Sequence, residues 1–188
     1  MKILRAGDYK RMPWKNGGGE TVEIAIFPPA ATIDDFDWRV SMATVAEDGP
    51  FSMFEGIDRT LCVLSGNGIV ISVEGSEDVE LSPSSEPLDF PGDVITGARL
   101  LGGKVTDLNV MTNRHRKAHS VARVRFTGDI LIPSEGILTL IALISPPALE
   151  WGCGRLEYLD ALVLEPGDTV TLRSTMPTSI LKIEIFER

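Results

Sequence analysis

The sequence predicts an all-β protein that consists of two antiparallel β-barrels or sandwiches in one chain. Apolar and polar residues alternate at period two in several separated segments, and no window shows convincing helical periodicity. A Pro-Gly-Asp turn also occurs twice, at 91–93 and 166–168, and similar apolar residues precede both copies. This weak internal repeat indicates that each half contains a strand, a connection, a turn and a further strand.

The first half contains four strand-like segments in order. Alternation over 21–26 and 36–43 indicates two strands, which are ended by a Pro-Pro pair and an Asp-Gly-Pro turn. A third strand over 59–64 is followed by a tight turn at 65–68 and a return strand over 69–73. We therefore predict an antiparallel meander for this part of the chain.

The remaining segments complete the two halves. Residues 74–89 are rich in Ser, Glu, Asp and Pro, which predicts a solvated excursion. The strand 106–111 places Asp107, Asn109 and Met111 on one face. The basic run 113–119 is expected to be a linker or the start of the second barrel. Later strands are predicted over 137–144, 162–164, 169–173 and 180–186.

These segments predict two domains. Residues 1–114 are expected to form an N-terminal barrel with a candidate ligand pocket, and residues 115–188 a C-terminal barrel with a structural role. At 188 residues the chain is long enough for one sizeable core or for two small ones that share an interface.

Charge and hydropathy exclude several classes of partner. A formal net charge of -9 argues against a surface for nucleic acid or anionic membrane, because both require an excess of Lys and Arg. No apolar run approaches the ~20 residues that span a bilayer, and the N-terminus lacks a signal-peptide core. A cytoplasmic location is expected. Cys62 and Cys153 show no Cys-x-x-Cys spacing, which favours buried, reduced thiols.

The stretch from Met12 to Ile24 is the most unusual in the chain, because it contains three consecutive glycines. Glycine weakens regular elements, so such a run indicates a bend or a backbone that another group approaches closely. It is no phosphate-binding loop, since no Gly-Lys-Ser/Thr or Gly-x-Gly-x-x-Gly pattern opens a helix there. We predict that Trp14, Asn16 and the glycines form a wall or lid of the pocket; the alternative is a purely structural bend.

Five separated blocks occur in a defined order along the chain. They are Met-Pro-Trp-Lys-Asn-Gly-Gly-Gly at 12–19, Trp-Arg-Val-Ser at 38–41, Asp-Gly-Pro-Phe-Ser at 48–52 with Phe54, Asp-Arg at 58–59, and Asp-Leu-Asn-Val-Met at 107–111. Together they resemble the HutD/Ves family of the cupin superfamily. The blocks cover about residues 12 to 114, whereas the second half is similar mainly in its strand pattern and its turn.

The resemblance implies a bicupin: two jelly-roll-like cupin barrels in one chain, usually assembled as a homodimer. It connects the chain with histidine utilisation or with a branch described as stress-induced, and it implies no well-established enzymatic reaction. For the histidine-utilisation branch it implies binding of a formylated or formiminated glutamate, which would restrain the output of the pathway.

The cupin metal site is not expected here. Cupin enzymes generally hold a metal through His-x-His, a glutamate and a later histidine, and the Val-Leu-x-Gly hairpin aligns this pattern with Ser52, Phe54 and Arg59. None of these suits a divalent cation, so we predict no metal and no cofactor. His115 and His119 fall in the basic run, away from the polar strand faces, and a catalytic role is not expected for them.

A polar pocket that binds a small carboxylate is predicted in the first barrel. Arg39 or Arg59 is expected to bind the carboxylate through its guanidinium fork. Asn109, Asn16 and Glu23 are expected to meet a formyl, formimino or amide group, beside an apolar wall. The complete predicted set is Trp14, Asn16, Gly17, Gly18, Glu23, Arg39, Ser41, Ser52, Phe54, Arg59, Asp107 and Asn109.

Several alternatives stay open. Alternation does not tell which face of a sheet is inside, so the polar face could be the wet face of a one-sided sheet, and Trp14 could simply pack. Asp58 is expected to pair with Arg59 and orient it, and Met111 to belong to the core. The predicted function is a non-enzymatic binding protein. The alternatives are a metal-independent hydrolase or isomerase with Glu23 or Asp107 as base, and an interaction scaffold that forms a dimer.

Overall fold

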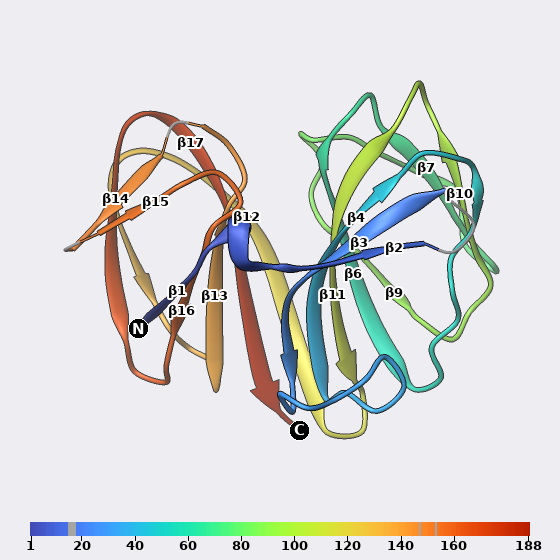
Figure 1. The fold of residues 1–188 in the computed structure, drawn as a ribbon, viewed down its shortest axis with the longest axis horizontal. Helices are drawn as coiled ribbons and strands as arrows, with labels where there is room; N and C mark the ends of the chain where they lie inside the picture. The colour runs from blue at the N-terminus through green and yellow to red at the C-terminus, as the bar shows by residue number, and fades with distance from the viewer. Residues whose placement is uncertain (15–17, 147, 153) are drawn as a thin grey trace. The chain divides into compact units, whose positions relative to one another are not determined.

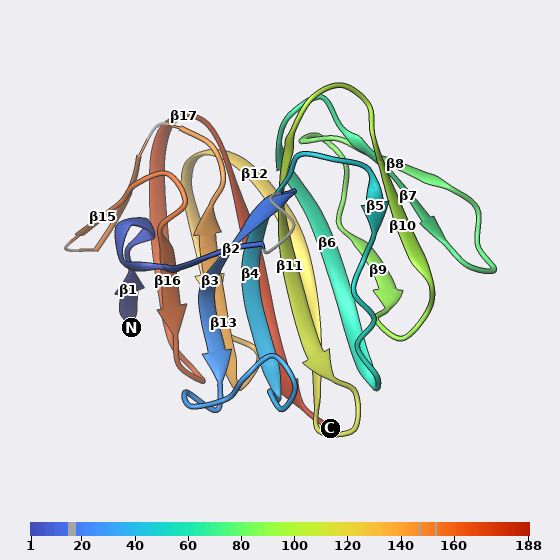
Figure 2. The same ribbon diagram turned by 45° about the vertical axis from the view of Figure 1, so that its right-hand side comes forward.

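The computed structural model describes residues 1–14, 18–146, 148–152 and 154–188, and within them the chain is built from strands (Figures 1 and 2). This confirms the all-β prediction. None of the described segments is a helix long and apolar enough to cross a membrane. The elements are β1 (Lys2–Leu4), η1 (Ala6–Asp8), β2 (Lys10–Pro13), β3 (Gly19–Phe27), β4 (Trp38–Val45), β5 (Gly49–Pro50), β6 (Ile57–Ser65), β7 (Ile69–Val73), β8 (Val79–Leu81), β9 (Leu88–Pro91), β10 (Thr96–Leu100), β11 (Val105–Asn113), β12 (Lys117–Pro133), β13 (Leu138–Leu143), β14 (Leu149–Trp151), β15 (Gly154–Leu156), β16 (Ala161–Leu164) and β17 (Thr169–Glu187).

The described residues form two compact units. The 10–118 unit also contains Arg188, and the 119–187 unit also contains residues 1–9. Residues 1–9 thus belong to the same compact unit as residues 119–187, whereas the domains expected from the sequence were 1–114 and 115–188. The reason is local: β1 pairs antiparallel with β16, and Arg5 Nη1 donates to Asp160 Oδ2 at 2.6 Å.

The 119–187 unit holds an antiparallel sheet in the order β1-β16-β13-β17-β14-β15, with β12 also paired to β17. Its core contains aliphatic side chains that are fully or almost fully buried, with Val124, Phe126 and Trp151 packed against them. The alternation in the first part of β17 contributes to this core, because Val170 and Leu172 are buried between exposed neighbours, whereas the last four residues of β13 are all apolar and buried. The core residues are Ile132, Ile141, Leu143, Leu149, Leu156, Leu162, Leu164, Val170, Leu172 and Ile180.

The 10–118 unit consists of two sheets. Among the described residues, a six-stranded sheet has the order β2-β3-β4-β11-β6-β9, and a four-stranded sheet has the order β5-β10-β7-β8. The predicted antiparallel meander is wrong. β11 lies between β4 and β6, and β6 and β7 belong to different sheets although only the turn at 66–68 separates them.

Two glycines explain why the chain leaves one sheet for the other at this turn. Gly66 and Gly68 have φ of 103° and 114°, a region that L side chains rarely adopt. A Cβ on Gly66 would lie 2.6 Å from the carbonyl oxygen of Lys104, and one on Gly68 would lie 2.8 Å from that of Leu81. The turn is therefore pressed against neighbouring backbone and redirects the chain, instead of closing a two-stranded hairpin.

The space between the two sheets is the core of the 10–118 unit. Leu61, Val63 and Phe90 from the six-stranded sheet pack with Ile69 and Ile71 from the four-stranded sheet. Leu61 and Val63 thus mark the inner face of β6, and residues that oppose them directly in the ladder share that face.

Candidate functional site

The strand register brings most of the predicted polar residues onto the inner face of the six-stranded sheet. Asn109 of β11 lies opposite Ser41 of β4 on one side and opposite Leu61 of β6 on the other. Ser41 in turn lies opposite Glu23 of β3. Since Leu61 points into the core, Glu23, Ser41 and Asn109 do so as well. The polar face is therefore the interior, not the wet face of a one-sided sheet.

A second row of the same face carries the two arginines. Met111 of β11 lies opposite Arg39 of β4 and opposite Arg59 of β6. Arg39 and Arg59 are each only 5% exposed. Met111 is 2% exposed and packs in an apolar cluster with Phe36 and Ile57, which confirms that it belongs to the core.

Arg59 lies within an aromatic cage. Its guanidinium carbon is 4.8 Å from the ring centre of Phe51, 5.2 Å from that of Phe90 and 5.8 Å from that of Phe54. Cation–π attraction offsets part of the cost of burying the charge. Burial lowers the pKa of Arg59 to about 10, with Arg39 adding repulsion and Asp107 opposing the shift, so the side chain stays cationic at neutral pH.

A chain of hydrogen bonds leads from Arg59 to Asp107. Arg59 Nη2 donates to Asn109 Oδ1 at 2.6 Å, and Asn109 Nδ2 donates to Asp107 Oδ1 at 2.6 Å. Arg59 Nη1 also donates to the backbone oxygen of Ser52 at 3.4 Å. Two buried atoms of this chain, Arg59 Nε and Asp107 Oδ2, have no partner among the described residues.

Asp107 is the most deeply buried acid of the inner face. It is 0% exposed and lies opposite Ala43 of β4 and Val63 of β6. Burial raises the pKa of Asp107 to about 7, although Arg59 and the hydrogen bond from Asn109 oppose the shift. A carboxyl group of this kind exchanges its proton near neutral pH, which neither an exposed aspartate nor a salt-bridged one does.

Arg39 presents part of its guanidinium group without a partner. Its Nε donates to Glu23 Oε2 at 2.8 Å, and the exposed fractions of the two side chains are 6% and 16%. No described residue accepts a hydrogen bond from the two terminal nitrogens of Arg39. A cationic fork with two donors that no described residue uses is suited to a carboxylate.

The glycine-rich stretch is anchored at the edge of this sheet. Trp14 Nε1 donates to Thr21 Oγ1 at 2.8 Å, and the Trp14 and Gly19 backbones share a hydrogen bond of 2.9 Å. A Cβ on Gly19 would lie 2.3 Å from the Thr44 oxygen and 2.9 Å from the Trp14 ring. The glycine run was predicted to lie close to another group, and at Gly19 the Thr44 backbone and the Trp14 ring are that close.

The predicted wall or lid is only partly described. Gly18 is buried and accepts a hydrogen bond from the backbone N–H of Ala46 at 3.0 Å. Trp14 is half-buried. Asn16 and Gly17 lie outside the described residues. The role of this segment as a wall or lid stays a prediction.

The remaining predicted residues lie on the segment after β5. Ser52 is exposed and directs only its backbone oxygen to Arg59, whereas the half-buried Phe54 contributes its ring to the cage. The expected pairing of Asp58 with Arg59 is wrong. Asp58 Oδ1 accepts from Arg114 Nε at 2.9 Å instead, because successive residues of a strand point to opposite faces and Asp58 cannot follow Arg59 inward.

Phe51 and Phe90 also contact Arg59, although the sequence did not predict them as its neighbours. Phe90 is brought there by the pairing of β9 with β6, where it lies opposite Arg59. In the sequence, Phe90 stands out only because it immediately precedes the first Pro-Gly-Asp turn. That position does not indicate which strand it pairs with.

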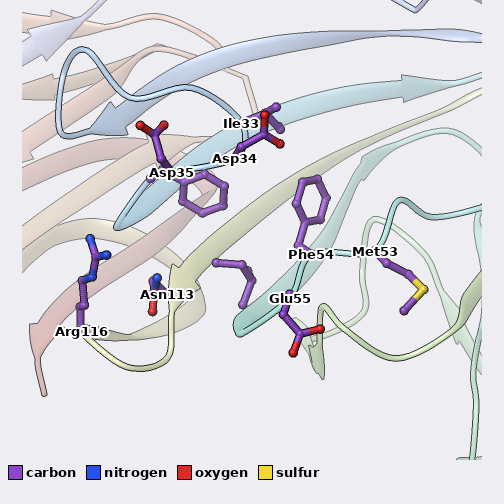
Figure 3. Close-up of a pocket in the computed structure, with 10 residues that line it drawn as sticks. Ile33, Asp34, Asp35, Met53, Phe54, Glu55, Asn113 and Arg116 are labelled. Carbon is purple, nitrogen blue, oxygen red and sulfur yellow. The ribbon is translucent and has the colours of Figure 1, made fainter.

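The 10–118 unit also has a pocket that Phe54 lines (Figure 3). It has a volume of about 370 Å³, and Arg59, Asn109 and Asp107 are not among its lining residues. Arg116 on one side of this pocket is paired with Asp37 at 2.5 Å. The lining residues are Ile33, Asp34, Asp35, Phe36, Met53, Phe54, Glu55, Ile57, Asn113 and Arg116.

Metal-ligating side chains do not gather in the described part of the chain. No group of three or more His, Cys, Asp or Glu residues there could hold a metal ion. The chemistry available on the inner face is therefore that of two buried cations, an amide, a hydroxyl and two acids.

The fold resembles that of solved structures far removed in sequence. The bacterial pirin YhhW from Escherichia coli is 9% identical, with a TM-score of 0.69 over 97% of this chain and 96% of that one. Vicilin from hazelnut (Corylus avellana) is also 9% identical, with a TM-score of 0.70 over 97% of this chain and 85% of that one. At such identities the likeness concerns the all-β fold alone.

Closer comparisons define the family. The chain matches the HutD family over residues 6–181 and therefore belongs to it. HutD from Pseudomonas fluorescens SBW25, solved in a formate condition, is 30% identical with a TM-score of 0.86, over 100% of this chain and 98% of that one. The conserved protein of unknown function PA5104 from Pseudomonas aeruginosa PAO1 is 32% identical with a TM-score of 0.88, over 98% of both chains.

Curated relatives match over a shorter part. An uncharacterized 21.2 kDa protein in the hutC 3′ region of Pseudomonas putida is 41% identical over 111 residues, which is 59% of this chain and 57% of the relative. Protein Ves from Citrobacter koseri is 40% identical over 113 residues, or 58% of each chain. The aligned part of this chain thus spans less than two thirds of the length of these relatives.

Proposed function

We propose that this protein is a non-enzymatic small-molecule-binding protein that regulates or buffers histidine utilisation. Membership of the HutD family supports a role linked to that pathway. The proposed ligand is a carboxylate of the formylated or formiminated glutamate kind, bound between the sheets of the 10–118 unit. The proposed binding residues are those predicted from the sequence, extended by Phe51 and Phe90.

The observation that carries the proposal is the unused fork of Arg39. Two of its nitrogens have no acceptor among the described residues, although the side chain is almost fully buried and its Nε is held by Glu23. Arg39 and Arg59 lie on one inner face on either side of Met111, and an anion bound between them would offset part of the cost of burying two cations. Asn109 and Ser41 on the adjacent row can then meet the polar groups of the same ligand.

The test is binding of N-formyl-L-glutamate and N-formimino-L-glutamate, followed by thermal unfolding and calorimetry. A ligand at 100 times its Kd should stabilise the protein by about 2.7 kcal/mol, which appears as a higher Tm. Arg39→Ala should weaken binding roughly 10- to 100-fold, because a charge-assisted hydrogen bond contributes about 1.5–3 kcal/mol.

A matched control is available in the other unit. Arg173 forms an exposed fork with Asp129, so Arg173→Ala removes an arginine without touching the inner face and should leave binding unchanged. If neither compound binds to the wild-type protein at millimolar concentration, the proposed ligand class is wrong.

The second candidate function is a metal-independent hydrolase or isomerase that acts on the same small acids. The raised pKa of Asp107 favours it, because a carboxylate that titrates near neutral pH can act as a general base. Turnover of either compound by metal-stripped protein, lost in Asp107→Asn or Glu23→Gln, would establish this alternative.

We further propose that the two units are two cupin barrels, that the 119–187 unit is structural, and that the protein is a cytoplasmic homodimer. A Pro-Gly-Asp turn in each unit and the match of YhhW to 97% of the chain support the first point. Sedimentation or light scattering would test the oligomeric state.

A further inference from the structure

The hydrogen-bond chain on the inner face has a fixed direction. A guanidinium group has donors only, so Asn109 must turn Oδ1 toward Arg59 and therefore Nδ2 toward Asp107. Asp107 Oδ1 is consequently an acceptor, whatever the protonation state of the carboxyl group. The hydrogen bond from Asn109 therefore favours the other oxygen, Oδ2, as the position of any proton that Asp107 carries.

Asp107 Oδ2 is the buried oxygen that no described residue contacts through a hydrogen bond. Leaving a buried polar atom unpaired costs about 1–3 kcal/mol, so a bound group that forms a hydrogen bond with Oδ2 would stabilise the arrangement. Arg59 Nε at the other end of the chain is in the same situation. Both positions belong to side chains that are at least nine-tenths buried.

We propose that Asp107 is a specificity-determining residue that binds an anionic ligand as a neutral carboxylic acid, donating a hydrogen bond from Oδ2–H to an oxygen of the ligand. Binding of the anion to the ionised protein then takes up one proton, which ends on Asp107 Oδ2. This inference rests on the proposed function, because it requires an anion in the interior of the 10–118 unit.

The charged groups around Asp107 support this protonation state. Arg59 on β6 stabilises the ionised form, and Arg39 on β4 lies on the same face but is neutralised in part by Glu23 on β3. Burial nevertheless dominates and raises the pKa of Asp107 to about 7. A bound anion adds a like charge to the same interior, which favours the neutral acid further. A neutral Asp107 leaves both arginine charges available to the ligand.

The experiment is calorimetric titration of N-formyl-L-glutamate into the full-length protein between pH 6 and pH 8.5. Carboxyl groups of this probe titrate near pH 4, far below this range. At pH 8, titrations in buffers of different ionisation enthalpy should show uptake of close to one proton per bound ligand. The Kd should rise up to tenfold per pH unit above the pKa of Asp107.

Asp107→Asn is the decisive variant, because the amide can accept from Asn109 through Oδ1 and donate permanently from Nδ2. It should bind the probe with an affinity like that of the wild type at pH 6, with no proton uptake and with little dependence on pH. His115 and His119 are present in both proteins, so the difference between them isolates Asp107. Asp107→Leu, which cannot donate, should weaken binding at every pH and serves if the asparagine variant does not fold.

The outcomes separate the two proposals. Binding by the wild type without proton uptake at pH 8, or loss of binding by folded Asp107→Asn at every pH, overturns the inference and leaves the proposed function standing. If the wild type binds neither this probe nor N-formimino-L-glutamate at any pH, the proposed function fails and the inference fails with it.

Discussion

At the scale of single residues, the most informative feature is that cations and an acid occupy the interior of the 10–118 unit. Arg59 is accommodated by three aromatic rings and by Asn109, and Arg39 by Glu23. Such burial is tolerated when partners supply most of the lost hydration, and it usually coincides with function. Arg59 Nε and Asp107 Oδ2 are the atoms of this group that no described residue contacts through a hydrogen bond, and the proposed ligand would meet them.

The burial of Asp107 predicts an unusual dependence of stability on pH. Its pKa is higher in the folded protein than in the unfolded chain, so the folded state binds more protons between about pH 4 and pH 7. Its contribution to stability therefore decreases as pH rises through this window. Asp107→Asn removes the ionisation and should stabilise the ligand-free protein at pH 8, by at most about 4 kcal/mol, with little effect at pH 4.

Thermal or urea unfolding of both proteins at the two pH values measures this difference. Asp129→Asn is a suitable control, because Asp129 is an exposed partner of Arg173 in the other unit. That variant should not gain stability at pH 8. Equal stability of Asp107→Asn and wild type at both pH values would show that Asp107 remains ionised without penalty in the folded protein.

The error at Asp58 shows what adjacency in sequence does not reveal. Asp58 and Arg59 are neighbours in the chain, but the pleat of β6 points them to opposite faces. The actual partner, Arg114, lies on the turn after β11 and donates both to Asp58 and, through two nitrogens, to Asp93. An ion pair between residues so distant in sequence depends on the fold and leaves no local signal.

At the scale of elements, alternation predicted the strands and their two faces but not their partners. The segments around 21–26, 36–43, 59–64 and 106–111 are strands, and the polar residues share a face as expected. Period-two patterning carries no information about which strand lies alongside, so the insertion of β11 between β4 and β6 was not foreseen. That insertion is what brings Asn109 and Asp107 between the two arginine-bearing strands.

We predict that Gly19, the first residue of β3, does not tolerate a side chain. In Gly19→Ala the new Cβ would meet the Thr44 oxygen at 2.3 Å and the Trp14 ring at 2.9 Å, so backbone must move. We expect a loss of about 1–3 kcal/mol in the free energy of unfolding, and weaker ligand binding because β3 also carries Glu23. Urea unfolding measures the first effect and calorimetry the second.

Gly49 provides the comparison for this prediction. It lies in β5 of the same unit, and a Cβ there would meet nothing within 4 Å. Gly49→Ala should therefore change stability by no more than about 0.5 kcal/mol. If the two substitutions cost the same, the loss at position 19 reflects general strand effects instead of the close approach.

At the scale of the whole molecule, each unit has its own hydrophobic core, and the candidate site lies within one of them. The three-residue strand β1 is too short to show periodicity, so its pairing with β16 left no signal in the sequence. The strands predicted over 137–144, 169–173 and 180–186 correspond to β13 and β17, whose apolar residues contribute to the core of the 119–187 unit.

Because the candidate site lies in one unit, we predict that ligand binding slows backbone hydrogen exchange mainly in that unit. Hydrogen exchange of backbone amides should slow on β3, β4, β6 and β11 when N-formyl-L-glutamate is bound, because the ligand stabilises only the states in which that site is intact. Strands β13, β14 and β16 of the other unit should show much smaller changes. Mass-spectrometric exchange of the free and bound protein measures both sets, and uniform protection would place the ligand elsewhere.

The paired register of Arg39, Met111 and Arg59 has a consequence for selectivity. Neighbouring strands lie about 4.8 Å apart, so the two arginines stand two strand spacings from each other in the backbone. The distance between the two arginines is therefore fixed by the spacing between strands and by the position of each arginine along its strand. If the proposed ligand joins both arginines, moving one arginine by two residues along its strand, to the next inward position, would change the length of diacid that fits, whereas remodelling the surface loops would not.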